Sequence, residues 1–301
     1  MKIAMIGAGA VGSVMGGILS KDHDVTLVGR PDHVKAVKKG GLIVEGEGTF
    51  SVKAETDTSS VPIQDMVVIT VKAHDLDRAV QDSKRLIGPG TFLMIVQNGL
   101  SVLGAPMRVS FARTCIGVAY MGATTIAPGK VRSVSRTKIV IGCVDGRIAQ
   151  PTLLARILNG SGLRSEVTDD VIGEVWKKTL VNAAVNPVTA ILMEPNGAIL
   201  KDPRSLAISK RLFGEGLAVA RYWNVLNESA ISYEDVEKVV LATADNRSSM
   251  LQDLERGKRT EIDAINGAIC RMSPDPDMTR TNARMVEIVK SLETWRTRDG
   301  G

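Results

Sequence analysis

Short apolar runs alternate with small-residue and polar segments along the first part of the chain. Apolar residues dominate 2–6, 25–28, 66–71 and 91–96, and turn-forming residues lie between these runs. Short, almost uniformly apolar runs are typical of parallel strands that are buried on both faces of a sheet. The pattern therefore predicts a doubly wound α/β domain with a largely parallel sheet at the N-terminus.

The pattern changes after residue 113. We expect further strands at 114–120, 130–135 and 138–143, with turns at 127–129 and 136–137, as an antiparallel extension of the sheet. A helix at 151–158 and a strand at 163–167 follow. Long helical segments begin near residue 168, so the predicted organisation is a Rossmann domain over 1–167 and an all-α domain over 168–301.

A glycine-rich sequence directly follows the first predicted strand. It reads Gly7-Ala8-Gly9-Ala10-Val11-Gly12, the GxGxxG pattern, and a small-residue helix pattern comes next. The first glycine makes a tight turn, the second lets a pyrophosphate approach the backbone, and the third lets the helix pack closely on the strand. The helix N-terminus then favours phosphate. We predict a dinucleotide site here, and a glycine-rich turn without a ligand is the alternative.

The same region has a second interpretation, because Ile3 to Ser20 carries no charge. A stretch of this length could be an export signal or a membrane span. Its five glycines weaken a regular apolar helix, however, and no other stretch approaches the length of a span. We therefore expect a cytoplasmic protein that does not act in a membrane.

The second strand ends in Gly29-Arg30, where NAD-binding units usually carry an acidic residue. Arginine suits a ribose 2′-phosphate through its planar, charge-assisted hydrogen bonds, so we favour NADP(H). Asp32, two residues on, leaves NAD(H) open, and a solvated loop cation is the alternative for Arg30.

Lys72 and Asn98 follow two later strands and are expected at the ligand-binding edge of the sheet, although Asn98 could simply form a turn with Gly99.

Composition and charge exclude several classes of protein. The net charge is +5, but aromatic residues make up only 3% of the chain and no dense Lys/Arg run occurs, which argues against a nucleic-acid partner. The three cysteines are far apart and the three histidines show no ligand spacing. We therefore expect neither a disulfide framework nor a metal site.

A polar stripe interrupts an otherwise apolar helix in the second domain. Lys178, Asn182 and Asn186 follow one another at intervals of four residues, and each step rotates by only about 40°, so they share one face. The surrounding residues are apolar nearly all round, which predicts burial. Buried polar groups persist when they pair or line a polar cavity, so we predict a ligand site. Pro187 should kink or end the helix just beyond it.

A third polar cluster covers residues 245–263. Asp245, Asn246, Ser248 or Ser249 could cap a helix there. Thr260 and Asp263 are spaced like a capping box, which would place Glu261 in a first helical turn. Glu261 is then either a charge favoured by the helix dipole or the carboxylate partner of Lys178.

Six segments together resemble ketopantoate reductases (2-dehydropantoate 2-reductases). They are GAGAVG at 7–12, VKAHD at 71–75, QNG at 97–99, EVWKKTLVNAAVNPVTAI at 174–191, PNG at 195–197 and NRSSMLQDLERGKRTEID at 246–263. The resemblance implies a Rossmann domain, a helical domain and a cleft between them. It also implies NADPH-dependent reduction of 2-dehydropantoate to (R)-pantoate, in pantothenate and coenzyme A biosynthesis.

The resemblance assigns roles to individual residues. Lys178 takes the place of the catalytic lysine, and the i+4 stripe selects it over the adjacent Lys177; Glu261 is its acidic partner. Substrate-side positions are Asn98, Asn182, Asn186, Asn196, Asn246 and Ser249. Cofactor-side positions are Asn98, Lys72 and Arg30, besides the glycine turn. A small 2-keto acid is the expected ligand, and a homodimer is a possible assembly.

Two other functional classes stay open at this stage. One is a different oxidoreductase on the same fold, such as a related 2-keto-acid or hydroxy-acid dehydrogenase. The other is a non-enzymatic NADP-sensing protein, which would have no use for a buried proton donor. This chain also departs from the family pattern at Arg247 and in the polar, proline-rich stretch 272–279.

Overall fold

The computed structural model describes residues 1–105, 114–133, 138–227 and 229–299. The chain divides into two compact units, each described separately below. The Rossmann unit comprises Met1–Gln97 and Val102–Val171, and the helical unit comprises Asn98–Ser101 and Ile172–Gly301. The later division therefore lies four residues beyond the boundary expected at 167/168, and a four-residue segment after the strand at 87–96 groups with the helical unit.

An open sheet forms the centre of the Rossmann unit, and eight strands within the described residues build it in the order β12-β11-β8-β7-β6-β1-β2-β5. They are β1 (Lys2–Ile6), β2 (Asp24–Val28), β5 (Lys53–Glu55), β6 (Gln64–Ile69), β7 (Ile87–Val96), β8 (Thr114–Tyr120), β11 (Lys138–Gly142) and β12 (Ser165–Val167). The run from β5 to β8 is parallel throughout. The apolar residues at 3–6, 66–69 and 93–96 of its central strands are buried, as their uniform apolar composition predicts.

Residues 114–144 only partly form the antiparallel extension that we expected. β8 runs parallel to β7, β11 runs antiparallel to β8, and β12 runs parallel to β11. The expected strand at 130–135 is instead β10 (Lys130–Ser133) of a second sheet, and residues 134–137, with the expected turn, lie outside the described part. The period-two pattern identified a strand but could not identify its neighbours.

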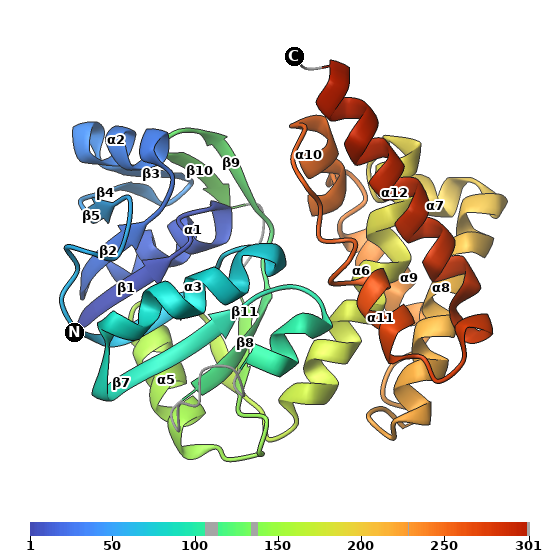
Figure 1. Cartoon of the computed structure of the whole chain (residues 1–301), viewed down its shortest axis with the longest axis horizontal. Coiled ribbons are helices and arrows are strands. Elements are labelled where there is room, and N and C mark those ends of the chain that lie inside the picture. The colour runs from blue at the N-terminus through green and yellow to red at the C-terminus, as the bar shows by residue number, and fades with distance from the viewer. Residues whose placement is uncertain (106–113, 134–137, 228, 300–301) are drawn as a thin grey trace. The chain divides into compact units, whose positions relative to one another are not determined.

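The second sheet has the order β4-β3-β10-β9 among the described residues. Its other strands are β3 (Leu42–Glu45), β4 (Gly48–Phe50) and β9 (Ala123–Ala127). This sheet packs against helix α1 (Ala10–Leu19), as Figure 1 shows. A Cβ on Gly17 would lie 3.2 Å from side-chain atoms of Leu42 and Phe50, so the small residues of α1 let the sheet approach closely.

Helices cover the Rossmann unit at both faces of its sheet, as a doubly wound fold requires. Besides α1 they are α2 (Pro31–Gly40), α3 (Leu76–Ser83) and α5 (Ala149–Gly160), with 3₁₀ turns at Ala73–Asp75 and Lys84–Leu86. His33 of α2 is buried between Ser13 of α1 and Gly129, which precedes β10. Its Nδ1 accepts from the Gly129 N–H at 3.1 Å, and its Nε2 lies 3.1 Å from the Ser13 hydroxyl. This ring therefore ties three elements together in its neutral form.

The helical unit is all-α within its described residues. Its helices are α6 (Val171–Leu192), α7 (Ala198–Lys201), α8 (Pro203–Tyr222), α9 (Tyr233–Ala242), α10 (Ser249–Glu255), α11 (Asn266–Met272) and α12 (Arg280–Asp299). A short 3₁₀ helix lies at Pro276–Thr279. Another, Leu100–Gly104, begins in the helical unit and ends in the Rossmann unit. Within the described part of the chain, none of the helices combines the length and the hydrophobicity of a membrane span.

We expected Pro187 to kink or end the helix; α6 continues past it to Leu192, so the expected end is wrong. Proline lacks the N–H that would bond to the carbonyl four residues earlier, which here belongs to Ala183. The buried amide of Asn266 donates to that carbonyl at 3.1 Å, and it also donates to Asn282 at 2.9 Å. A side chain from another helix thus replaces the missing donor, and the helix extends for a further turn.

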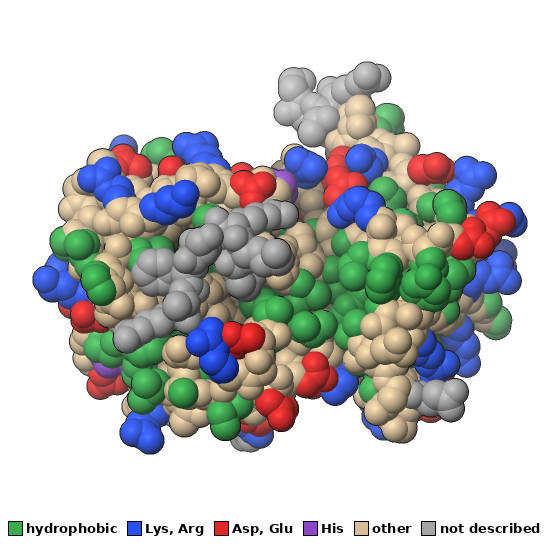
Figure 2. Space-filling model, turned by 60° about the horizontal axis from the view of Figure 1, so that its bottom comes forward, with side chains coloured by type: hydrophobic (Ala, Val, Ile, Leu, Met, Phe, Trp, Pro, Cys, Tyr) green, Lys and Arg blue, Asp and Glu red, His purple; other side chains and the backbone are tan. Residues whose placement is uncertain are grey.

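Charged side chains do not form one uniform surface. On the face that Figure 2 shows, Lys and Arg side chains lie among Asp and Glu side chains. Many of them form exposed ion pairs, for example Lys53 with Asp24 at 2.7 Å and Lys138 with Glu166 at 2.7 Å. Such pairs contribute at most about 1 kcal/mol each to stability, so these charges solvate the surface rather than hold the fold together.

Candidate active site

The glycine turn has the geometry that dinucleotide binding requires. Gly7 has φ of +103°, and a Cβ there would lie 2.7 Å from the backbone nitrogen of Val71. A Cβ on Gly12 would lie 2.4 Å from the Gly7 carbonyl oxygen, so only glycine lets α1 approach the strand this closely. Nothing lies within 4 Å of a Cβ built on Gly9. The middle glycine thus leaves its backbone open to a ligand at the start of α1.

Ala8, Ala10 and Val11 fill the remaining positions of the turn, whose own contacts keep it in shape. The backbone nitrogens of Gly7 and Ala8 both donate to the Val28 carbonyl at 2.9 Å. The Thr70 hydroxyl donates to the Gly7 carbonyl at 2.8 Å. Thr70 follows β6 and was missed in the sequence; only its position at the end of a buried strand could have indicated it.

Arg30 and Lys72 lie at the same edge of the sheet as the glycine turn. Arg30 comes two residues after β2 and its side chain is exposed at the start of α2. The Arg30 guanidinium forms no hydrogen bond or ion pair with another described residue, so it is free to bind an anion. Lys72 comes three residues after β6, is partly exposed and precedes a 3₁₀ turn. Since β1, β2 and β6 are parallel neighbours, their carboxyl ends share one edge.

The polar stripe of α6 lies in apolar surroundings, as its neighbours in the sequence predict. Leu180, Ala183 and Ala184 are fully buried, and Asn186 is only 6% exposed. The side-chain amides of Asn182 and Asn186 make no hydrogen bond with any other residue that the structure describes. An amide removed from water without a partner costs about 1–3 kcal/mol, so the buried Asn186 and the partly buried Asn182 are suited to bind a polar ligand.

Lys178 lies on this stripe, and only part of its side chain reaches the surface. Removal of the ammonium from water lowers the pKa of Lys178 to about 8, while the negative charge of Glu261 acts to raise it. An amine with a pKa near neutrality can donate a proton and be reprotonated at physiological pH. The adjacent Lys177 differs, because it forms an ion pair with Glu174 at 3.0 Å. Lys178 is therefore the stronger candidate for proton transfer.

Glu261 does not lie in a first helical turn, and the predicted capping box is wrong. Residues 261–265 form a hydrogen-bonded turn, and α11 begins only at Asn266. The Thr260 hydroxyl accepts from the Ile262 N–H at 3.2 Å, whereas Asp263 forms ion pairs with Arg259 and Lys290, each at 3.3 Å. The spacing resembled a cap, but long-range partners bind both side chains.

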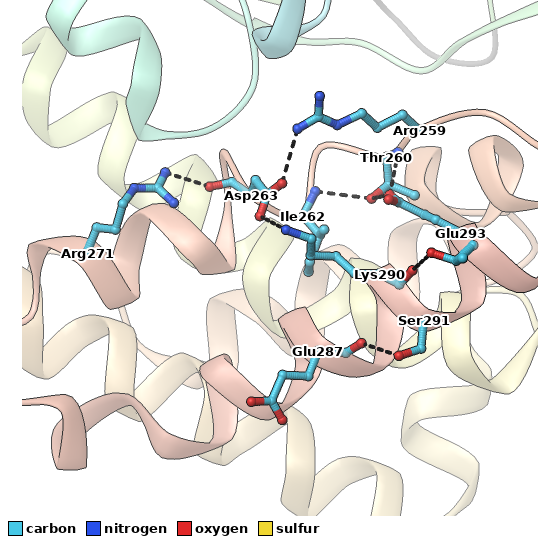
Figure 3. A network of polar contacts seen from close by, with 10 residues as sticks. Arg259, Thr260, Ile262, Asp263, Arg271, Glu287, Lys290, Ser291 and Glu293 are labelled. Carbon is cyan, nitrogen blue, oxygen red and sulfur yellow. Dashed lines mark hydrogen bonds and ion pairs between the residues drawn. The ribbon is translucent and has the colours of Figure 1, made fainter.

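Figure 3 shows how this turn is anchored. The backbone N–H and hydroxyl of Thr260 both donate to Glu293 of α12, at 2.7 and 2.5 Å. Arg271 of α11 donates to the Asp263 backbone carbonyl at 2.8 Å. The residues on either side of Glu261 are thus bonded to two helices, so the position of its carboxylate depends on the tertiary structure.

Asn98 contacts this turn through its side chain. Its amide donates to the Glu261 carboxylate at 3.0 Å, and the Leu100 N–H donates to the Ala264 carbonyl at 3.0 Å. Gly99, with φ of +83°, lies against Ala264 so closely that a Cβ would be 2.2 Å from its carbonyl oxygen. Asn98 follows the end of β7, and Lys72 follows the end of the neighbouring parallel strand β6, as expected. The hydrogen bond to Glu261 was not expected for Asn98.

The remaining substrate-side candidates lie around the start of α10. Asn196 is buried, and its amide donates to the Thr243 hydroxyl at 2.9 Å. The Asn196 N–H donates to the Asn246 carbonyl at 2.9 Å. Ser248 caps α10 by accepting from the Leu251 N–H at 3.2 Å, which leaves the exposed Ser249 in the first turn. The structure thus brings Asn196, Asn246 and Ser249 to one segment of the helical unit.

These features define a class of protein. A Rossmann unit with an open glycine turn, followed by a helical unit with a partly buried lysine beside a carboxylate, is the architecture of a nicotinamide-dependent oxidoreductase. The family described as ketopantoate reductase PanE/ApbA matches residues 3–146, and its C-terminal counterpart matches residues 170–293. The chain belongs to the ketopantoate reductase family, and it is an oxidoreductase of that family.

Individual relatives cover nearly the whole chain. The 2-dehydropantoate 2-reductase of Pyrococcus horikoshii is 37% identical over 273 residues, which are 89% of either chain. That of Archaeoglobus fulgidus is 32% identical over 297 residues, covering 97% of this chain and 98% of the relative.

Two solved structures have closely similar folds. A ketopantoate reductase family member from Ralstonia eutropha gives a TM-score of 0.88 at 29% identity over 99% of this chain and 100% of its own. A D-mandelate dehydrogenase with NADH and anilino(oxo)acetate gives 0.89 at 25% identity over 99% of each chain.

Proposed function

We propose that this protein reduces 2-dehydropantoate to (R)-pantoate with NADPH, a step of pantothenate and coenzyme A biosynthesis. The observation that carries the proposal is the polar stripe of α6, where Lys178 has a pKa of about 8 and Asn182 and Asn186 lack partners among the described residues. The curated relatives named 2-dehydropantoate 2-reductase support the choice of substrate.

The residues of the Rossmann unit fit the dinucleotide. Gly9 leaves open space at the start of α1 for a pyrophosphate, and Gly7, Ala8, Ala10, Val11 and Gly12 form the remainder of the turn. The exposed Arg30 suits a ribose 2′-phosphate, which favours NADPH over NADH. Lys72, at the same edge of the sheet, supplies a second positive charge toward the cofactor. When bound, the nicotinamide supplies the hydride that adds to the keto carbon.

Lys178 is the proton donor of the proposed mechanism. Negative charge develops on the ketone oxygen as its carbon is reduced, and a lysine ammonium can stabilise that charge and then transfer a proton to it. General acid catalysis of this kind contributes about 10²- to 10⁴-fold to the rate. Glu261 favours the ammonium form of Lys178 through its charge, and Asn98 orients the Glu261 carboxylate.

The amides and one hydroxyl would position the substrate. Asn182 and Asn186 extend from the lysine along α6, and Asn98, Asn196, Asn246 and Ser249 complete the proposed set. Such groups can hydrogen-bond the carboxylate and hydroxyl of a hydroxylated 2-keto acid and so select the face of the ketone that receives hydride. A sensor of NADP would need none of these groups, which favours an enzyme.

A related 2-keto-acid or hydroxy-acid dehydrogenase is the second candidate function. It is supported by the structural similarity to D-mandelate dehydrogenase, whose complex contains NADH. A substrate panel, followed by NADPH or NADH oxidation, separates the two candidates. The proposal predicts the highest kcat/KM with 2-dehydropantoate and NADPH. A higher value with an aromatic 2-keto acid, or with NADH, would contradict it.

We further propose that the protein acts in the cytoplasm as a homodimer. Reduced cysteines are consistent with a reducing compartment, and Cys115, Cys143 and Cys270 are free thiols. Sedimentation equilibrium of the full chain tests the assembly, and a monomer at micromolar concentration would contradict it.

A further inference from the structure

The segment that carries Asn246 has no regular secondary structure of its own. Residues 246–248 lie between the turn that follows α9 and the start of α10. Their position therefore depends on bonds to other elements. One of these bonds is a backbone interaction with the turn after α6, where the Asn196 N–H donates to the Asn246 carbonyl at 2.9 Å. A second bond from the same turn holds the residues just before the segment: the Gly197 N–H donates to the Ala244 carbonyl at 2.9 Å.

A third bond joins this segment directly to α6. The hydroxyl of Thr189 hydrogen-bonds to the hydroxyl of Ser248 at 2.8 Å, and both residues are buried, at 0% and 6% exposure. Ser248 in turn accepts from the Leu251 N–H and caps α10. The start of α10 is thus bonded to α6 through one pair of side chains.

Thr189 belongs to the face of α6 that carries the polar stripe. It lies eleven residues after Lys178, which corresponds to a rotation of only about 20° on an α-helix. The stripe thus continues beyond Asn186 for almost one turn, and its last member contacts Ser248, which directly precedes Ser249. The Thr189 hydroxyl also lies within hydrogen-bonding distance of the Val185 and Asn186 carbonyls of its own helix. The sequence could not show whether this hydroxyl bonds only to its own helix or also to another segment.

We propose that Thr189 and Ser248 are positioning residues for substrate binding: their hydrogen bond holds Asn246 and Ser249 in register with the amides of α6. Neither hydroxyl needs to touch the substrate for this role. The inference rests on the proposed function, because it assumes that Asn246 and Ser249 bind the substrate. It adds a side-chain pair that the family resemblance did not single out.

Substitution of Thr189 by valine tests the proposal, because valine keeps the shape and removes the hydroxyl. Loss of one hydrogen bond that orders a ligand-binding segment should raise KM for 2-dehydropantoate about threefold to tenfold. KM for NADPH should stay within about twofold, because the cofactor is proposed to bind the other unit. Thr189→Ser retains the hydroxyl and should restore the wild-type KM.

Thr179→Val is the matched control. Thr179 lies on the same helix, is buried, and bonds to the Val175 carbonyl four residues earlier, as Thr189 does to Val185, but it does not contact Ser248. Its KM for the keto acid should remain that of the wild type. The proposal would be overturned if KM for 2-dehydropantoate rose equally in the two valine variants, or did not rise in Thr189→Val.

Hydrogen exchange of the backbone amides tests this inference independently of whether the proposed function is correct. Backbone amides of residues 249–252 should exchange faster in Thr189→Val than in Thr179→Val, whether or not the wild-type protein reduces 2-dehydropantoate. Unchanged exchange there would overturn the positioning role even in an active enzyme. Ser248→Ala removes the same bond from its other end, and it decides the question if Thr189→Val does not fold.

Discussion

The amide of Asn98 donates a 3.0 Å hydrogen bond to the carboxylate of Glu261, 163 positions further along the chain. This hydrogen bond fixes the orientation of the Glu261 carboxylate. The negative charge of Glu261 in turn opposes the effect of burial on Lys178. The three side chains therefore form a connected group in which an amide orients a carboxylate and the carboxylate favours an ammonium.

The first prediction concerns the chemical step. Lys178→Ala should lower kcat by about 10²- to 10⁴-fold, because it removes the proposed general acid. The dissociation constant of NADPH, measured by fluorescence, should change by less than about threefold. Lys177→Ala is the matched control and should retain most of the activity. Near wild-type turnover in Lys178→Ala would show that another group transfers the proton.

The second prediction concerns pH. Keto-acid reduction needs the Lys178 ammonium, so kcat/KM should fall as pH rises through about 8. Glu261→Gln removes the charge that raises the pKa of Lys178, and it should move this decline to lower pH. Glu194→Gln alters an exposed carboxylate on the same unit and should leave the profile unchanged. A pH profile that is identical in Glu261→Gln and wild type would contradict the coupling.

The third prediction concerns cofactor selection. Arg30→Ala should raise KM for NADPH about tenfold or more, the effect of losing a charge-assisted hydrogen bond, and leave KM for NADH nearly unchanged. Lys35→Ala removes an exposed cation from α2, the helix that Arg30 directly precedes, and controls for the general loss of positive charge. Equal effects of Arg30→Ala on both cofactors would exclude a contact with the 2′-phosphate.

The fourth prediction separates two glycines of the turn. In Gly12→Ala the new Cβ meets the Gly7 carbonyl and the Thr70 hydroxyl at 2.4 Å, so the free energy of unfolding should fall by about 1–3 kcal/mol in urea titrations. In Gly9→Ala the Cβ enters open space, so stability should change little while NADPH binding weakens. Unchanged NADPH affinity in Gly9→Ala would mean that the dinucleotide does not approach this backbone.

The fifth prediction concerns acid stability of the Rossmann unit. Burial lowers the pKa of His33, whose Nδ1 accepts the Gly129 N–H. Because the folded-state pKa lies below the unfolded value of about 6.5, the unfolded chain binds the proton more readily, and stability should decrease as pH falls below that value. In His33→Gln, thermal unfolding followed from pH 8 to pH 5 should show a smaller decrease. An equal decrease would assign the acid sensitivity to other groups.

The local sequence pattern was sufficient for several features. The positions of the central buried strands, the glycine turn after β1 and the placement of Lys178, Asn182 and Asn186 on one helix face all follow from spacing and composition. Each of these features depends on residues that are close together in the sequence, within one strand or a few helical turns. The spacing of apolar and polar residues over such a short stretch indicates its secondary structure and its buried face. The fold class and the stripe were therefore predictable before any tertiary contact was known.

Other features were decided only by packing between distant segments. The residues after β7 join the helical unit through Gly99 and Leu100, the Glu261 turn is held by Glu293, and Asn266 supplies the donor that Pro187 lacks. Each case pairs groups more than thirty residues apart, and each group could have satisfied a local role instead, as the mistaken capping box illustrates. A one-dimensional pattern indicates that a polar group needs a partner, but only the folded chain determines which partner lies within hydrogen-bonding distance.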